Sequence, residues 1–180
     1  THMGPAAACG LMHVESNALG TDFQGNLFAT AFNLRKITRH QLTPTGATFT
    51  SQDSDFLVAN QMDFHPTDIL EDGDGSLLVI DTGGWYKLCC PTSQLHKPDA
   101  LGAIYRIRKT SHPTIEDPYG HNIDWNQQHL TPLLKDPRAL VRKHAIEALS
   151  QRGNASIAPL LTLITSPSEP RRVVQDALWA

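Results

Sequence analysis

The sequence predicts a protein of the β plus α class, with an all-β part at residues 5–108 followed by an all-α part at residues 123–180. Two observations predict this division. A run that begins with glycine and alternates like a strand occurs at residues 25–32 and again at residues 75–81, an offset of 75 − 25 = 50 residues. Beyond residue 122 the apolar residues recur about every 3.6 positions, as on one face of a helix, rather than every second position.

Seven short runs in the first part have the composition and the flanking turns of β-strands. Clusters of glycine, proline, asparagine and aspartate separate these runs. Asp74-Gly75 stands between two of them and predicts a tight hairpin. The expected strands are residues 11–14, 26–32, 36–42, 47–50, 67–70, 76–81 and 103–108.

A period of about 40 to 50 residues, built from short strands and glycine turns, is typical of the blades of a β-propeller. Residues 5–108 hold about two blades of antiparallel strands, too few to close a ring. We therefore expect a partial β-propeller that belongs to a larger protein. Residues 1–4, which begin Thr1-His2-Met3, are expected to be a cloning remnant outside the fold.

Residues 109–122 have the composition of a linker, because two prolines and a glycine discourage regular structure there. After this linker, apolar residues recur with helical spacing in several stripes, which are interrupted at Asp136-Pro137 and at residues 167–170. Short helical pairs of this kind predict a short α-solenoid, in which each repeat buries its apolar face on the next. The stripes are Trp125, Leu130, Leu133 and Leu134, then Leu160, Leu161 and Ile164, and the matching sets Val141, Ala145, Ala148 and Val173, Ala177, Ala180, which superpose at an offset of 32 residues.

The composition narrows the classes of function. A chain of 180 residues with 40% apolar residues is ordinary for a globular protein. Its net charge of −3 favours neither a nucleic-acid surface nor a basic membrane anchor. No apolar run approaches the roughly 20 residues that span a bilayer. We therefore expect no nucleic-acid partner and no membrane span in this chain.

The three cysteines leave the redox state open. They are Cys9, Cys89 and Cys90, with no Cys-x-x-Cys pair. A disulfide from Cys9 to Cys89 or Cys90 would close a loop of about 80 residues, stabilise the fold by about 4 kcal/mol and indicate an extracytoplasmic location. The alternatives are three buried free thiols or a strained Cys89–Cys90 ring.

Four residues are candidates for a site. His65 precedes a proline at the start of the strand expected at residues 67–70, which would be the innermost strand of its blade and would line the central channel of the propeller. If His65 and Asp68 both face this channel, they would bind a ligand or relay a proton. The alternative for His65 is a turn histidine whose imidazole bonds to backbone groups. Asp81 and Trp85 end a strong strand and would stack on a planar cofactor, although aromatic residues at such corners are more often packing anchors.

No metal site is expected in the chain. Asp72-Gly73-Asp74-Gly75 has alternating acids but no glutamate at the twelfth position of a calcium loop. The nine histidines show neither the spacing nor the cysteine context of a zinc site. A Gly-x-Ser-x-Gly nucleophile motif is also missing.

The motifs resemble one family. Phe64-His65-Pro66-Thr67-Asp68-Ile69, Asp74-Gly75-Ser76-Leu77, Asp81-Thr82-Gly83-Gly84-Trp85 and Gly102-Ala103-Ile104-Tyr105-Arg106-Ile107 together resemble the closing blades of large secreted propeller proteins of planctomycetes. Those proteins are classed as membrane-bound dehydrogenases and are similar to soluble quinoprotein glucose and sorbosone dehydrogenases. Asp136-Pro137-Arg138 with Val141-Arg142 resembles the HEAT-like repeats that follow the propeller in this family.

The resemblance implies the C-terminal part of an extracytoplasmic dehydrogenase, periplasmic or secreted. Its parent would oxidise a sugar or polyol with pyrroloquinoline quinone (PQQ) and calcium. In the soluble quinoproteins the catalytic histidine and most quinone contacts come from earlier blades. This chain would therefore contribute part of the funnel lining and a helical docking module, without activity of its own.

Two other classes of function remain open. The chain would act as a non-catalytic scaffold if its exposed blade edges pair with a second copy and its helical repeats bind a protein partner. It would act as a propeller hydrolase of the lactonase type if inward-facing acids hold a calcium ion. Sizing of the protein and sensitivity to a chelator distinguish these two.

Overall fold

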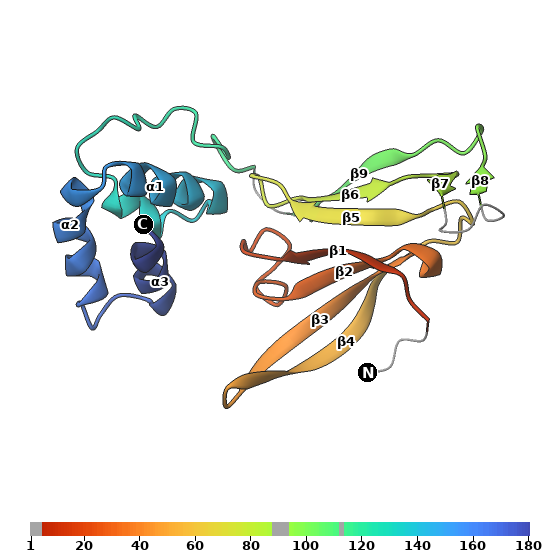
Figure 1. Ribbon diagram of the computed structural model, residues 1–180, viewed down its shortest axis with the longest axis horizontal. Helices are drawn as coiled ribbons and strands as arrows, with labels where there is room; N and C mark the ends of the chain where they lie inside the picture. Colours follow the sequence, from red (N-terminus) through yellow and green to blue (C-terminus); the bar gives the residue numbers. More distant parts are fainter. Residues whose placement is uncertain (1–4, 88–93, 112–113) are drawn as a thin grey trace. The chain divides into compact units, whose positions relative to one another are not determined.

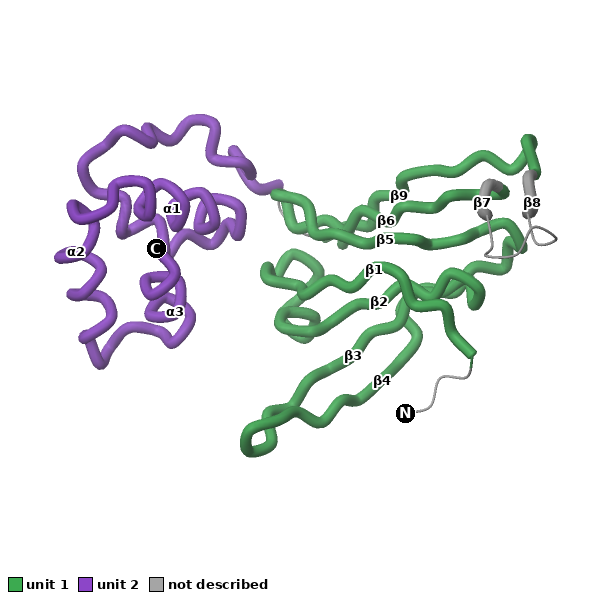
Figure 2. The backbone as a smooth tube through the Cα atoms, in the orientation of Figure 1, with its two compact units in different colours: residues 1–112 green, residues 113–180 purple. Residues whose placement is uncertain are grey.

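The chain folds as two compact units, residues 1–112 and residues 113–180 (Figure 2). The computed structural model describes residues 5–87, 94–111 and 114–180. The first unit consists of antiparallel β-sheets, and the described helices longer than one turn lie in the second unit (Figure 1). The predicted β plus α class is therefore confirmed.

The first sheet contains four antiparallel strands that follow one another in space as they do in the sequence. They are β1 (Ala8–His13), β2 (Leu27–Ala31), β3 (Lys36–Thr45) and β4 (Thr48–Val58). A short 3-10 turn at Phe32–Leu34 joins β2 to β3. The sheet is thus a simple meander, with β1 at one edge and β4 at the other.

Strand β4 is much longer than the sequence predicts. It was expected at residues 47–50, whereas it pairs with β3 from Thr48 to Val58. The added residues begin Ser-Gln-Asp-Ser-Asp, a polar run without the apolar alternation that marks a half-buried strand. The β3–β4 hairpin forms because its backbone groups pair, although most of its side chains stay exposed.

The second sheet has the order β5-β6-β9, with β5 at Pro66–Glu71, β6 at Leu77–Asp81 and β9 at Ala103–Ile107. Between β6 and β9, β7 (Trp85–Lys87) pairs with β8 (Gln94–His96). The predicted hairpin at Asp74-Gly75 joins β5 to β6. Its turn needs glycine at position 75, because the φ angle there is +73° and a Cβ atom would lie 2.2 Å from the Ala18 side chain.

The two sheets bury one shared core. Strands β1 and β5 lie side by side, so the sheets meet along their first strands (Figure 1). The approach is so close that a Cβ atom on Gly10 would stand 2.7 Å from the Cα atom of Asp68. Phe28 packs edge-to-face on Phe56 at 4.8 Å. The buried core residues are Met12, Val14, Phe28, Ile37, Phe64, Ile69, Leu77 and Val79.

The second unit contains α1 (Ala139–Gln151), α2 (Asn154–Ile164) and α3 (Arg171–Trp179), preceded by a 3-10 helix at Thr131–Lys135. The predicted offset of 32 residues is seen in burial, because Val141 and Ala145 of α1 and their matching residues Val173 and Ala177 of α3 are all buried. The first apolar stripe forms only the short 3-10 helix. Pro132 at its start and Asp136-Pro137 at its end leave no room for a longer one.

Among the residues that the structure describes, no helix is both long and apolar enough to cross a lipid bilayer. The longest described helix, α1, has 13 residues.

Candidate functional site

A cavity of about 580 Å³ lies where β5 begins, and we call it the His65 cavity. Its volume is in the range of small-molecule sites, about 300 to 1,000 Å³. It draws its walls from the N-terminal segment, the β2–β3 turn, the segment before β5 and the segment after β8. The described lining residues are Ala7, Phe32, Asn33, Arg35, Met62, Asp63, His65 and Lys97.

His65 forms one wall of the cavity. Its Nδ1 atom lies 2.8 Å from the carbonyl oxygen of Gly83 and 3.1 Å from that of Asp63. A carbonyl oxygen only accepts, so Nδ1 carries the proton in these contacts. The ring also lies 4.6 Å from the Phe32 ring, centroid to centroid. These bonds to backbone groups are those of a turn histidine, the alternative that the sequence left open.

Asp81 fixes the backbone around His65 through hydrogen bonds. The carboxylate is buried, and its Oδ1 atom accepts hydrogen bonds from the backbone N–H of His65 at 2.8 Å and of Gly83 at 2.9 Å. The antiparallel register of β5 and β6 places Pro66 opposite Asp81, which brings the two ends together. Asp81 is thus a positioning residue for His65.

The other sequence candidates lie elsewhere. Asp68 is exposed on β5, where its Oδ1 atom accepts from the Ile69 N–H at 2.8 Å, close to Gly10. It therefore has different surroundings from His65. Trp85 begins β7, and its side chain lies outside the described part of the structure.

The cysteine predictions are addressed only at Cys9. Its side chain is exposed on β1 rather than buried, and its sulfur lies 3.7 Å from the carbonyl oxygen of Ala7. Cys89 and Cys90 lie outside the described residues. The pairing of the three thiols therefore stays a prediction.

The charged residues of the cavity were not found from the sequence. Lys97 Nζ pairs with Asp63 Oδ1 at 2.5 Å, and the Arg35 guanidinium contacts the sulfur of Met62. Residues 35, 63 and 97 belong to three separate segments, so no short motif contains them. Asn33 closes one side, because its amide accepts from the Ala7 N–H and donates to the Pro5 carbonyl, both at 2.7 Å.

The acids of the β5–β6 hairpin are engaged by arginines of the neighbouring strand and of the residues just after it. Arg106 lies 2.6 Å from Asp72 Oδ2, and Arg108 lies 2.8 Å from Asp74 Oδ2. The Asp74 carboxylate also accepts from Ser76. In residues 5–87, 94–111 and 114–180, no three His, Cys, Asp or Glu side chains are arranged to hold a metal ion.

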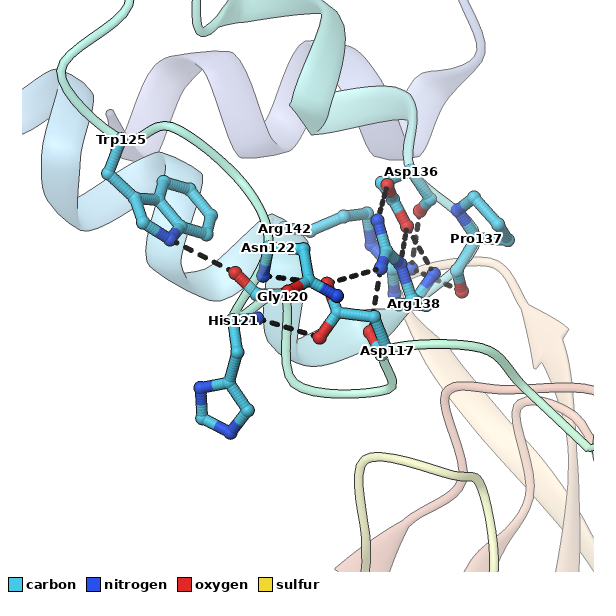
Figure 3. Close-up of polar contacts among 9 residues, drawn as sticks. All are labelled: Asp117, Gly120, His121, Asn122, Trp125, Asp136, Pro137, Arg138 and Arg142. Atoms are coloured by element: carbon cyan, nitrogen blue, oxygen red, sulfur yellow. Dashed lines mark hydrogen bonds and ion pairs between the residues drawn. The ribbon is translucent and has the colours of Figure 1, made fainter.

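The second unit has a polar cluster at the start of α1 (Figure 3). Asp117 accepts from the backbone N–H of His121 at 2.7 Å, which closes a turn within the segment expected to be a linker. Arg138 donates to the Asp117 carbonyl and pairs with Asp136, both at 2.7 Å. The buried Arg142 donates to the Asp136 carbonyl at 2.9 Å. Arginines therefore fix this turn onto α1.

Two opposing effects set the pKa of Asp136. Burial acts to raise the pKa of its carboxyl, but hydrogen bonds from the Arg138 side chain and backbone, with the charges of Arg138 and Arg142, bring it below the ordinary value of 3.8. The same pairing raises the pKa of Arg138, although its partial burial opposes this. Both groups are therefore charged at neutral pH, and this fits a structural role.

Two antiparallel sheets that share one core and have a cavity at one end, followed by a helical unit, define a protein of mixed β and α structure. Residues 1–111 match the family described as Domain of unknown function (DUF7133), and the chain belongs to that family. Comparison with curated proteins gives no match, and comparison with solved structures gives none either.

Replacing Asp81 by alanine should loosen the His65 turn. The change leaves two buried N–H groups without their acceptor, which we expect to cost about 2 to 4 kcal/mol. Asp81→Asn should recover most of this, because both donors bind Oδ1 and an amide oxygen can take its place. Urea unfolding and amide hydrogen exchange of β5 and β6 measure the loss of stability in each of the two variants. Equal damage from both variants would contradict the acceptor role.

Acid should weaken the second unit through Asp136. The folded-state pKa lies below the unfolded-state value, so the carboxylate stabilises the fold above pH of about 3.9, and this contribution is lost as the pH falls through the folded-state pKa. Asp136→Asn should cost about 1 kcal/mol at pH 7 and flatten the loss of stability in acid. Urea midpoints from the helical circular dichroism signal, measured from pH 7 to pH 3, test this.

Glu147→Gln is the matched control for Asp136→Asn. Glu147 is exposed on α1, and its substitution removes the same charge away from the cluster. The control should keep the acid dependence of the unchanged protein. If the urea midpoint of Asp136→Asn fell with pH as steeply as that of the unchanged protein, groups other than Asp136 would cause the acid dependence.

Proposed function

We propose that the chain is the closing part of an extracytoplasmic dehydrogenase, in which its two sheets are consecutive blades of a quinoprotein-type β-propeller. The helical unit is its HEAT-like docking module. The complete protein oxidises a sugar or polyol, and this chain has no such activity by itself. The observation that carries the proposal is a largely aliphatic sheet face that the described residues of the first unit leave exposed.

That face belongs to the second sheet, and we call it the outer face. The register places Leu70 beside Leu78, and Ile80 beside Ile104, on the side opposite the buried core. Two charged residues share this face at its corners, with Asp68 next to Ile80 and Arg106 next to Leu78. Ile104 is 69% exposed and Leu70 is 40% exposed. Val79, which alternates with Leu78 and Ile80 along β6 and so lies on the opposite face, is fully buried. An exposed aliphatic face of this kind marks a surface that binds another element.

A propeller blade needs two apolar faces, because it packs between two neighbours. One face of the second sheet packs on the first sheet and the outer face is exposed to solvent. This supports the proposal that a further blade packs on the outer face in the complete protein. The simple meander of both sheets and the side-by-side position of β1 and β5 also support consecutive blades. The dehydrogenase chemistry rests on the resemblance of residues 64–69, 81–85 and 102–107 to the closing blades of that family.

The cofactor would bind mainly to other blades. The described residues offer no cluster of three acids for a calcium ion, so the calcium ligands would come from outside this part of the chain. In the proposed protein, the first unit contributes part of the lining of the funnel. The helical unit offers Leu161, Leu178 and Trp179, all exposed, as contacts for a protein partner.

In isolation the outer face should cause self-association, because a second copy is the available partner. We expect the apparent mass from light scattering to rise with concentration. Ile104→Asp should abolish this rise, because it places a charge among the exposed aliphatic side chains of the outer face without disturbing the buried core. Ile157→Asp on α2 is the matched control, since Ile157 is 51% exposed but belongs to the other unit. Equal effects of both changes would contradict the role of the outer face.

Dye reduction tests the chemistry. A longer protein that includes the residues before and after this chain in its gene should reduce a redox dye when supplied with PQQ, calcium and aldoses. The present chain should not, because most cofactor contacts would be missing. No substrate-dependent reduction by the longer protein would defeat the dehydrogenase proposal, whatever the result of the association experiment.

A further inference from the structure

Arg35 occupies an unusual position in the His65 cavity. It ends the 3-10 turn after β2 with φ = 52° and ψ = 41°, a left-handed conformation that favours glycine or asparagine. An arginine there gains nothing for the turn. A strained non-glycine residue that lines a cavity indicates that its side chain has a role of its own.

The charge of Arg35 is not neutralised within the described structure. Its guanidinium contacts the sulfur of Met62, which carries no formal charge. The carboxylate that lines the same cavity, Asp63, is paired with Lys97 at 2.5 Å. The described lining therefore has two cationic side chains and one carboxylate. Arg35 is partly exposed, so an anion from solvent can reach its guanidinium, and a charge near a protein surface attracts an anion more strongly than one in bulk water.

The remaining walls limit the kind of anion. The Phe32 and His65 rings lie 4.6 Å apart with 32° between their planes, and Met62 adds an aliphatic surface. A guanidinium fork fits two oxygens of a carboxylate or of a phosphate, so the apolar walls, and not the fork, favour an organic carboxylate. The apolar walls then suit a hydrophobic body attached to it.

We propose that the His65 cavity binds a small organic carboxylate, with Arg35 forming a two-point contact to its oxygens and with Phe32, His65 and Met62 covering its apolar body. This binding site is independent of the proposed dehydrogenase function. It also explains why Asp81 and Asn33 are needed, because they fix the two sides of the cavity before a ligand arrives.

Calorimetric titration of the full chain with benzoate tests the site. At low ionic strength we expect saturable binding with a Kd of about 1 to 10 mM, as suits a ligand of this size. Arg35→Gln should weaken binding at least about tenfold, because a charge-assisted contact is lost. Arg35→Lys should retain part of the affinity, since it keeps the charge but loses the fork. Added salt should weaken binding to the unchanged protein.

The controls separate charge, shape and location. Arg171→Gln removes an exposed arginine from the second unit and should bind benzoate as the unchanged protein does. Benzyl alcohol, which has the ring without the charge, and inorganic phosphate, which has the charge without the ring, should each bind at least about tenfold more weakly. The proposal fails if benzoate shows no saturation, if Arg35→Gln binds it equally well, or if either control ligand matches it. Circular dichroism of each variant verifies that it is folded.

Discussion

The close contact of the two sheets along β1 and β5 is the constraint on which the first unit depends. Each sheet buries alternate side chains on one face, and the shared core from Phe28 to Val79 forms only if the sheets come together at this edge. Gly10 permits the approach, because any side chain there would meet the backbone of Asp68. Packing at normal protein density leaves little tolerance for error at such a point.

The cavity is a consequence of this packing and of strand register. Antiparallel pairing of β5 with β6 places Pro66 opposite Asp81, so the carboxylate reaches the backbone of both His65 and Gly83. The first sheet supplies the opposite wall through the turn that follows β2, where Phe32 meets the His65 ring. A pocket with apolar walls and a few polar groups thus arises at the end of the two sheets, where backbone groups outside the ladders must find partners.

Arginine side chains hold together the irregular part of the second unit. Arg152 donates to the carbonyl oxygens of Trp125, Gln127 and Gln128, and Arg142 donates to those of Asp136 and Pro137. These carbonyls lie outside any helix, so the arginines take the place of the backbone donors that a helix would supply. The leucine spacing before residue 135 correctly indicated burial, since Leu130 and Leu134 are buried, but it did not indicate how the backbone is bonded. Apolar spacing therefore indicates which side chains are buried, and it indicates an α-helix only where prolines do not interrupt the segment.

The sequence by itself determined the β plus α class, the hairpin at Asp74-Gly75 and the burial of Val141 and of Val173, because each is indicated by the pattern within its own stretch of chain. The tertiary structure decided the length of β4, whose polar residues carry no strand signal, and the joining of Arg35, Asp63 and Lys97 in one cavity. Local patterns report turn chemistry and which side chains avoid water. Register and the meeting of distant segments follow from closure of the whole core, which no short stretch of sequence contains.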